Sequence, residues 1–495
     1  MAIMSIGRII GALAERTPDQ PAITYEDRTV TWIELEKRTN RLARAYHRLG
    51  VSQDDLVTIA LPNGIEFYES ALAIWKLGAT PQPISPRLPK LERETIVALA
   101  NPKIVIGVEP ASLSTRPTLT GGFEPELSLP DTPLPDRSAR YWKAPTSGGS
   151  TGRPKIIVSK APGEFDTDLA NPLHIVPGRA HLVPGPLYHN APFVFSMHAL
   201  FLGNHLVILP RFEALRTLEC IARYRIDYVV LVPTMMHRIW RLGPELRDRH
   251  DLSSLRIMVH MAAPCPRWLK EEWIKWLGPD RVHELYGATE QQSATWITGT
   301  EWLEHPGSVG RPLAGGSMKV FDPSGKECHP GTIGEIYMMP DAGTGTTYRY
   351  IGAECKSLRG WESLGDMGWT DAHGYLYLAD RRTDMILRGG ANIYPAEVEA
   401  AIDSHPSVRS SAVIGVPDED LGQRVHAIVD APGGVTDDEL LAHLAERLVR
   451  YKIPQSFEYV SEPLRDDAGK VRRPALRERC LAASADAFPR AKPID

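Results

Sequence analysis

The chain has 495 residues, of which 43% are hydrophobic and 24% charged, a composition typical of an enzyme-sized globular protein with room for about three domains or subdomains. Its formal net charge of −5 argues against a general attraction to nucleic acid or anionic membranes, because no surplus of lysine and arginine is present to neutralise phosphates. We therefore expect a small-molecule enzyme without a nucleic-acid partner.

Cysteine usage and the N-terminus favour a cytoplasmic location. The five cysteines lie far apart and form no CxxC pair, which argues against a disulfide framework and against a zinc cluster. Residues 1–20 contain an apolar stretch interrupted by Arg8, Glu15 and Arg16, so a short amphipathic helix is predicted there rather than a signal peptide. Because no run of 18 apolar residues occurs, we expect no integral membrane association.

Helical and strand patterns alternate from the N-terminus onward. Residues 31–50 carry apolar groups at helical spacing, 57–63 read as a buried strand, and a second helix is predicted at 65–77. This alternation predicts an α/β fold with mostly parallel strands. Residues 107–140 are rich in Pro, Ser, Thr and Gly and are expected to form a surface excursion.

The same pattern returns between 181 and 290. Four strand-like segments, HLVPGPLY, NHLVILP, IDYVVLVPT and LRIMVHMA, are accompanied by predicted helices at 213–224 and 267–277. Each strand ends in a polar or Gly/Pro-rich turn, and ligands of open α/β sheets bind beyond such carboxyl ends. The chemistry is therefore expected at these turns.

A change in pattern near residue 383 predicts a second domain. Short elements and a charged helix at 436–450 follow, which are typical of a small α+β domain. We expect a large α/β domain over residues 1–382, built of subdomains with mostly parallel sheets, and a small α+β domain over 383–495.

The strongest local signal is TSGGSTGRPK at 146–155. Closely spaced glycines let backbone N–H groups surround phosphate oxygens, while hydroxyl side chains and Lys155 add donors and a cation. The spacing differs from the Walker loop, since Arg153 and Pro154 precede the lysine and Ile156 follows it. A glycine- and serine-rich loop by itself is more often a surface turn, so the other motifs decide.

Those motifs make the chain similar to the adenylate-forming superfamily of acyl-CoA synthetases, peptide-synthetase adenylation domains and luciferases. The resemblance covers nearly the whole length. It rests on the phosphate loop, YGATE at 286–290, LGDMGW with Asp366, RRTDMI at 381–386 and DDAGKVRR with Lys470, in that order. The combination with PLYHNAPF and MAAPCP is most similar to the bacterial bile-acid-CoA-ligase-like branch.

The resemblance implies ATP, Mg²⁺ and coenzyme A as ligands. It assigns Glu290 and Thr151 to Mg²⁺ and the phosphates, Asp366 and Arg381 to the ribose, and Lys470 to a mobile small domain that swings toward the substrate carboxylate. Joining two anions requires positive charge before the bond forms, which agrees with this set. The predicted catalytic residues are Lys470, Thr151 and Glu290. The predicted nucleotide and coenzyme A contacts are Ser147, Gly149, Ser150, Thr151, Gly152, Lys155, Ala262, Ala263, Tyr286, Gly287, Thr289, Asp366, Arg381, Gly389 and Gly390.

The acceptor and the acid are less well specified. LRGGANIYPAEVEAAI at 387–402 resembles the acyl- and aryl-CoA ligase version of this segment, and Gly389 and Gly390 would let the pantetheine arm pass close to backbone. Aromatic, Met and small residues at the strand ends suit a bulky apolar acid. The predicted acyl contacts are His189, Asn190, Phe193, Thr234, His260 and Met261.

Three departures from the family pattern bear on the second half-reaction. Thr383 stands at the hinge where Asp or Lys is usual, Asp380 replaces a usual glycine, and Gly148 replaces a frequent hydroxyl residue. The alternatives are an adenylating enzyme that delivers the acyl group to an amine or a carrier-protein thiol, and a nucleotide-binding homologue without turnover. A homodimer is compatible with the sequence, which does not fix the oligomeric state.

Overall fold

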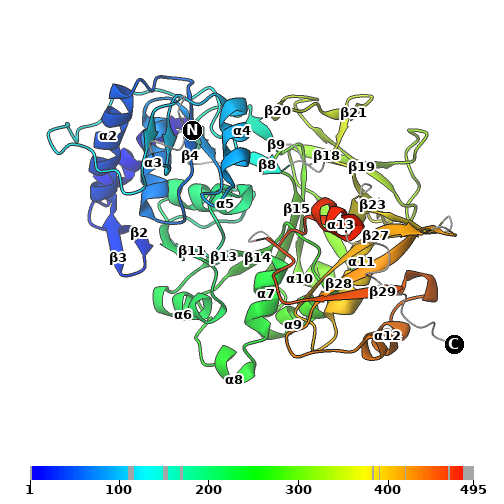
Figure 1. Ribbon diagram of the computed structural model, residues 1–495. Helices are drawn as coiled ribbons and strands as arrows, with labels where there is room; N and C mark the ends of the chain where they lie inside the picture. Colours follow the sequence, from blue (N-terminus) through cyan, green and yellow to red (C-terminus); the bar gives the residue numbers. More distant parts are fainter. Residues whose placement is uncertain are drawn as a thin grey trace.

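The computed structural model describes residues 3–109, 116–148, 154–167, 171–381, 384–388, 391–418, 420–466 and 469–482. In Figure 1 a blue N-terminal part leads into a green central sheet, which continues into a yellow β-rich part and an orange and red C-terminal part. The helices are α1 (Ile6–Arg16), α2 (Trp32–Arg48), α3 (Ile65–Lys76), α4 (Lys90–Ala100), α5 (Asn190–Phe201), α6 (Ala214–Tyr224), α7 (Pro233–Trp240), α8 (Pro244–Arg247), α9 (Arg267–Leu277), α10 (Gly299–Glu304), α11 (Pro395–Asp403), α12 (Asp437–Ala445) and α13 (Arg473–Ala482).

The largest sheet has 15 strands. In spatial order they are β21 (Lys356–Leu358), β22 (Trp361–Ser363), β19 (Gly334–Pro340), β23 (Asp366–Thr370), β24 (Leu376–Arg381), β17 (Ser308–Pro312), β16 (Ala294–Thr298), β15 (Val282–Gly287), β14 (Ile257–His260), β13 (Tyr228–Leu231), β11 (Ala180–Val183), β12 (His205–Ile208), β2 (Pro21–Tyr25) and β3 (Arg28–Thr31), with β18 (Gly316–Phe321) paired to β19.

The half of this sheet from β2 to β15 is parallel and covered on both faces. Neighbouring strands β2, β12, β11, β13, β14 and β15 pair in parallel, whereas β15 and the strands beyond it pair antiparallel. Successive residues alternate between two cores: Val229 packs with α6, α7 and α9, and Val230 packs with α1, α3 and α5. The predicted α/β fold is confirmed, and the parallel order brings the carboxyl ends of these strands to one edge.

Smaller sheets complete the molecule. They are β5 (Thr80–Pro83), β4 (Leu56–Ile59), β6 (Val105–Ile106) and β7 (Thr118–Leu119); β20 (Tyr348–Ile351), β9 (Pro154–Ser159) and β8 (Thr146–Gly148); β27 (Ser410–Asp418), β28 (Gly422–Asp430) and β29 (Ser456–Val460); β25 (Ile386–Arg388) and β26 (Ala391–Ile393); and β1 (Ile3–Ser5) and β10 (Glu164–Asp166).

Local sequence signals explain most element boundaries. Thr31 caps α2 in a reciprocal capping box with Glu34, and the helix ends two residues before Gly50, as predicted. The predicted strand at 57–63 is shorter in the structure, because β4 ends at Ile59, three residues before Pro62, which has no backbone N–H to donate to a neighbouring strand.

The predicted helix at 436–450 also ends early. Thr436 and Glu439 form the capping box of α12, but the helix stops at Ala445, where the N–H groups of Arg447 and Leu448 both turn back to the carbonyl of Leu444. The 3₁₀ turn Arg450–Lys452 follows.

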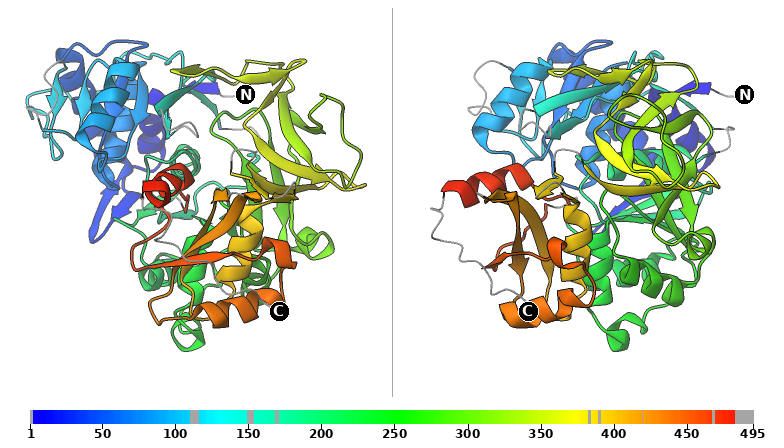
Figure 2. Two further views of the ribbon diagram at one scale, coloured as in Figure 1. Left: turned by 45° about the vertical axis from the view of Figure 1, so that its right-hand side comes forward. Right: turned by 90° about the vertical axis from the view of Figure 1, so that its right-hand side faces the viewer.

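The C-terminal elements have a core of their own. Side chains of β25 to β28 and of helices α11 and α12 form one apolar cluster that includes Ile386, Val398 and Leu440. The orange and red part that they form lies beside the green helices in both views of Figure 2. One contact between these parts is made by Arg241, which donates to the carbonyl of Val408. No helix among the described residues combines the length and apolar character needed to cross a bilayer.

Candidate functional site

The motif residues converge at the edge where the parallel strands end. β14 and β15 are parallel neighbours, so the turn at 261–263 and the YGATE segment leave the sheet side by side. Ala262 has a φ of +74°, a left-handed conformation that costs a non-glycine residue free energy. Such a conformation turns the backbone sharply at the strand end, where the predicted nucleotide contacts Ala262 and Ala263 lie.

The phosphate-loop motif begins and ends on a β-hairpin. In β8 and β9, Ser147 is the register partner of Lys155. The hairpin therefore holds both ends of the loop at one place, next to the end of β15. Four predicted phosphate contacts, Gly149, Ser150, Thr151 and Gly152, lie outside the described residues.

Lys155 and Glu290, 135 residues apart in the chain, form an ion pair. The Lys155 Nζ donates to Glu290 Oε1 at 3.2 Å and stands 4.0 Å from the centre of the Tyr350 ring. Glu290 is only 5% exposed. A carboxylate stays ionised at a buried position only when cations and hydrogen-bond donors surround it. The ion pair therefore brings together Lys155 and Glu290, two residues predicted to lie at the phosphates and Mg²⁺.

Tyr350 completes the surroundings of Glu290. Its hydroxyl donates to the same Oε1 at 2.6 Å, from β20, which pairs with β9. Burial and the neighbouring Glu290 raise the pKa of Tyr350, so the hydroxyl keeps its proton and remains a donor. Because the described donors both reach Oε1, Oε2 is the oxygen suited to a hard cation. This donor chemistry fits Mg²⁺.

The adenine and ribose candidates touch one another. The Tyr286 hydroxyl donates to Asp366 Oδ2 at 2.8 Å, which joins the end of β15 to the start of β23. Arg381, at the end of β24, is the register partner of Asp366, so the two predicted ribose residues are cross-strand neighbours. Gly287 and Thr289 flank this contact within YGATE.

The predicted acyl contacts of PLYHNAPF occupy the start of α5. His189 precedes the helix, and Asn190 begins it. The amide Oδ1 of Asn190 accepts a hydrogen bond from the ammonium of Lys143, a lysine that is only 1% exposed. Phe193 lies deeper, in the core, and its ring contacts Phe67.

Burial has a strong effect on Lys143. Burial lowers the pKa of the Lys143 ammonium to about 7, although the negative charge of Glu290 raises it. A second cation therefore stands close enough to Glu290 to be influenced by it. Lys143 is thus related both to Glu290 and to the predicted acyl contact Asn190.

The other predicted acyl contacts differ in burial. His260 is fully buried, with Nε2 3.7 Å from Glu284 Oε2, and burial lowers its pKa to about 4, so the ring is neutral. Met261 is partly buried against the core that contains α5. Ala263 is half-buried beside it. The acyl roles of these residues stay predictions.

Lys470 lies on a loop that reaches the large N-terminal part. The backbone N–H of Lys470 donates to Asp466 Oδ1, and the N–H of Asp466 donates to the carbonyl of Lys470, both at 2.9 Å. Gly469, with a φ of +75°, abuts Thr234 so closely that an added methyl group would stand 3.2 Å from its Oγ1. The structure thus brings the Lys470 loop to a predicted acyl contact.

Two residues at the site were missing from the sequence-based set. Tyr350 lies in TTYRYI and Lys143 just before the phosphate loop, and neither belongs to one of the five motifs. A lysine between the aromatic pair Tyr141–Trp142 and Ala144 was the one available signal. Gly389 and Gly390 lie outside the described residues, and so do the hinge residue Thr383 and the side chain of Arg381.

Comparison with known protein families gives two matches. The sequence profile described as AMP-binding enzyme matches residues 12–348, and that described as AMP-binding enzyme C-terminal domain matches residues 397–470.

Similar proteins extend over almost the whole chain. A feruloyl-CoA synthase from an Amycolatopsis species is 31% identical, over 94% of this chain and 97% of its own. An o-succinylbenzoate CoA synthetase from Bacillus subtilis, solved with its acyl-adenylate intermediate, is 25% identical with a TM-score of 0.81, covering 96% of this chain and 99% of its own. An amide bond synthetase from Marinactinospora thermotolerans is 25% identical with a TM-score of 0.79, covering 96% and 99%.

Proposed function

The chain belongs to the AMP-binding enzyme family, and on this premise we propose that it is an AMP-forming acyl-CoA ligase acting on a bulky, largely apolar carboxylic acid. The resemblance to adenylate-forming enzymes is confirmed at the level of the superfamily. The narrower likeness to the bile-acid-CoA-ligase-like branch stays a prediction. The observation that carries the proposal is the Lys155–Glu290 ion pair beside the Tyr286–Asp366 contact.

In the first step a carboxylate oxygen attacks the α-phosphorus of ATP. A bond forms between that oxygen and phosphorus, and the bond from phosphorus to the pyrophosphate oxygen breaks. The role proposed for Lys155 is to hold phosphate oxygens, and the role proposed for Glu290 and Thr151 is to bind Mg²⁺. When bound, Mg²⁺ offsets the negative charge of the phosphates. Tyr286 and Asp366 would hold the adenosine.

The role proposed for Lys470 is to bring a cation to the carboxylate during adenylation. The Gly469–Thr234 contact supports this, because it joins the Lys470 loop to the end of β13. We propose that the part from residue 383 onward is a separate domain that rotates after adenylation. The coenzyme A thiol would then attack the acyl carbonyl, expel AMP and lose its proton, with the pantetheine arm passing Gly389 and Gly390.

The proposed acid class rests on the start of α5 and on two relatives. Feruloyl-CoA synthase and o-succinylbenzoate CoA synthetase are named for acids with an aromatic ring. His189 and Met261 are suited to an apolar body, while the buried Lys143–Asn190 pair provides polar groups on the same side. We propose an aromatic or similarly bulky acid.

The direct test supplies ATP, Mg²⁺ and a panel of bulky carboxylic acids, with and without coenzyme A. Pyrophosphate release is followed and acyl products are identified by mass. Thioester that requires coenzyme A supports the ligase. Absence of pyrophosphate release across aromatic, bile and fatty acids would overturn the proposed acid class, and loss of turnover in Glu290→Gln serves as the control for site-specific chemistry.

A second candidate is transfer of the acyl group to an amine, which the similarity to an amide bond synthetase favours. Pyrophosphate release and acyl-AMP without thioester, followed by amide formation when amines are added, would support this candidate over the ligase. Carrier-protein thioester would be recognised by the mass of the acylated carrier.

The cellular setting belongs to the proposal as well. ATP and coenzyme A are available in the cytoplasm, and Cys220, Cys265, Cys328, Cys355 and Cys480 all carry free thiols, as expected in a reducing compartment. A homodimer remains a prediction that light scattering of the purified protein would test.

A further inference from the structure

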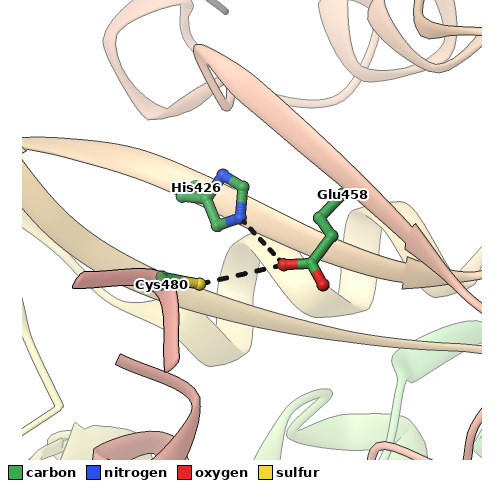
Figure 3. Close-up of side chains that lie close together, drawn as sticks. All are labelled: His426, Glu458 and Cys480. Atoms are coloured by element: carbon green, nitrogen blue, oxygen red, sulfur yellow. Dashed lines mark hydrogen bonds and ion pairs between the residues drawn. The ribbon is translucent and has the colours of Figure 1, made fainter. Parts of the chain in front are cut away.

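Three side chains of the types that bind metal ions in proteins lie close together in the C-terminal part. Figure 3 shows His426, Glu458 and Cys480 directed toward one another from β28, β29 and α13. The His426 Nε2 lies 3.8 Å from Glu458 Oε2, the Cys480 Sγ lies 3.8 Å from the same oxygen, and the ligand atoms are all within 4.8 Å of one another.

The fold places these residues together for simple reasons. β28 and β29 pair in parallel with His426 opposite Ser456, so Glu458, two residues further, emerges on the same face of the sheet. α13 covers that face, with Cys480 packed in an apolar cluster that includes Ile414 and Ile428. His426 is 0% exposed and Cys480 is 4% exposed. Water therefore has little access to two of the three donors.

Neighbouring groups orient the donor atoms. The His426 Nδ1 is 2.8 Å from Ser456 Oγ, which directs the other ring nitrogen toward Glu458. Arg479 donates to Glu458 Oε1 at 2.7 Å, so Oε2 is the oxygen that faces the imidazole and the thiol.

We propose that His426, Glu458 and Cys480 bind one Zn²⁺ ion. A mixed nitrogen, sulfur and oxygen set suits this borderline-soft ion, whereas Mg²⁺ prefers oxygen ligands alone. Zinc bonds of about 2.0–2.3 Å give tetrahedral edges of about 3.3–3.8 Å, close to the two 3.8 Å separations. On binding, the Cys480 thiol releases its proton to solvent and the sulfur donates its electron pair to the ion.

The ion would join both ends of one segment. Glu458 precedes the loop that carries Lys470, and Cys480 follows it. A bond from each to the same ion would fix α13 against β28 and β29, and with it the base of that loop. The role of the ion would be structural and independent of the reaction proposed above.

Cobalt(II) is the probe for the test, because thiolate bound to Co²⁺ gives a near-ultraviolet charge-transfer band that oxygen ligands do not give. The full-length enzyme is titrated with Co²⁺ in excess Mg²⁺, which occupies oxygen-only sites. We expect one equivalent of Co²⁺ to produce the band and Zn²⁺ to abolish it. Cys480→Ser should lose the band, while Cys220→Ser, a second buried cysteine on a helix, should keep it.

Zinc itself provides the second measurement. Binding is followed by competition with a chromophoric chelator, and the thermal unfolding midpoint is compared with and without Zn²⁺ for wild type, Cys480→Ser and His426→Gln. A rise in the midpoint for wild type alone supports the site. A folded wild-type protein without the cobalt band, or a band that survives Cys480→Ser, overturns it, whatever the result of the ligase assays.

Discussion

Two side chains, Lys155 and Tyr350, control the surroundings of the proposed metal ligand Glu290. Lys155 and Tyr350 both donate to Oε1 of Glu290, at 3.2 and 2.6 Å, and the carboxylate is nearly buried. Because both hydrogen bonds end on Oε1, they hold the carboxylate plane and so fix the direction in which Oε2 points. The consequence is a carboxylate whose second oxygen keeps one orientation before any ligand arrives, which is how preorganised sites lower the cost of stabilising charge.

Removal of the Tyr350 hydroxyl should therefore weaken metal-dependent adenylation. Hydrogen bonds to charged groups contribute about 1.5–3 kcal/mol, so Tyr350→Phe is expected to lower kcat/KM for pyrophosphate release by about 10- to 100-fold and to raise the Mg²⁺ concentration needed. The Mg²⁺ dependence of pyrophosphate release measures both. Tyr375→Phe is the matched control, since that hydroxyl donates to a different carboxylate, Glu301. Equal rates in both variants would remove Tyr350 from the site.

Lys143 makes stability depend on pH. Its pKa in the folded protein is about 7, below the ordinary value of 10.5, so between these values the unfolded chain binds more protons than the folded one. The free energy of unfolding contributed by this group therefore rises as the pH is raised through that window. Lys143→Met removes the dependence.

The measurement is the urea midpoint of wild type and Lys143→Met at several pH values from about 7 to about 9. We expect the wild type to gain stability relative to the variant as the pH rises. Lys37→Met, at an exposed lysine, is the control and should follow the wild type. A constant difference between Lys143→Met and wild type across the range would contradict the shifted pKa.

At the scale of elements, a buried ion pair fixes α9 against the strand that ends in YGATE. The Lys270 Nζ lies 2.5 Å from Glu284 Oε2, with the lysine side chain 1% exposed and that of the glutamate 10%. Burial opposes ionisation of Glu284, yet the adjacent ammonium outweighs it and the pKa of Glu284 lies below its usual value. Tyr286 and Glu290 follow on the same strand and turn, so their positions depend on this pairing.

The pair should be sensitive to removal of one partner. Lys270→Met leaves an uncompensated buried carboxylate and is expected to cost about 3–5 kcal/mol of stability. The double variant Lys270→Met with Glu284→Leu should recover most of that loss, because an apolar pair of similar volume needs no compensation. Urea unfolding of both variants gives the comparison. A double variant as unstable as the single one would show that packing rather than charge is decisive.

At the scale of the whole molecule, the two parts of the chain are in contact where chemistry is proposed. Arg241 binds backbone of the C-terminal part, and Gly469 abuts Thr234. This arrangement brings the Lys470 loop to the end of β13. We expect it to be the arrangement used for adenylation.

A disulfide can fix that arrangement. Thr234→Cys with Gly469→Cys is the pair to cross-link, because a Cβ added at Gly469 would stand 3.2 Å from Thr234 Oγ1, the atom that a cysteine sulfur replaces. The oxidised double variant should release pyrophosphate but form thioester at least about 10-fold more slowly, and reduction should restore it. The two single variants under the same oxidation are controls. Unchanged thioester formation in the cross-linked enzyme would exclude the rotation.

Lys470 should matter for one half-reaction only. An ion pair at about 4 Å contributes roughly 4 kcal/mol at an effective dielectric of about 20, so Lys470→Ala is expected to slow adenylation by about two to three orders of magnitude. Thioester formation from a supplied acyl-adenylate should change little. Near-normal pyrophosphate release, or an equal loss in both half-reactions, would contradict this role.

The sequence by itself predicted what is encoded in contiguous segments. The alternation of α2, β4 and α3 and the mostly parallel strands followed from hydrophobic periodicity, and chemistry was expected at the turns that end the strands, because these patterns depend on neighbours a few residues away. The family followed from five motifs in order. Element ends such as those of β4 and α12 were less accurate, because single turns decide them.

Only the tertiary structure decided which distant side chains meet. Tyr350 reaches Glu290 across 60 residues, and Lys143 reaches Asn190 across 47. The scattered cysteines argued against a zinc cluster, yet Cys480 meets His426 and Glu458 once a helix covers two parallel strands. Such contacts depend on strand order and helix placement, which no local pattern specifies, and for that reason they were visible only in the folded molecule.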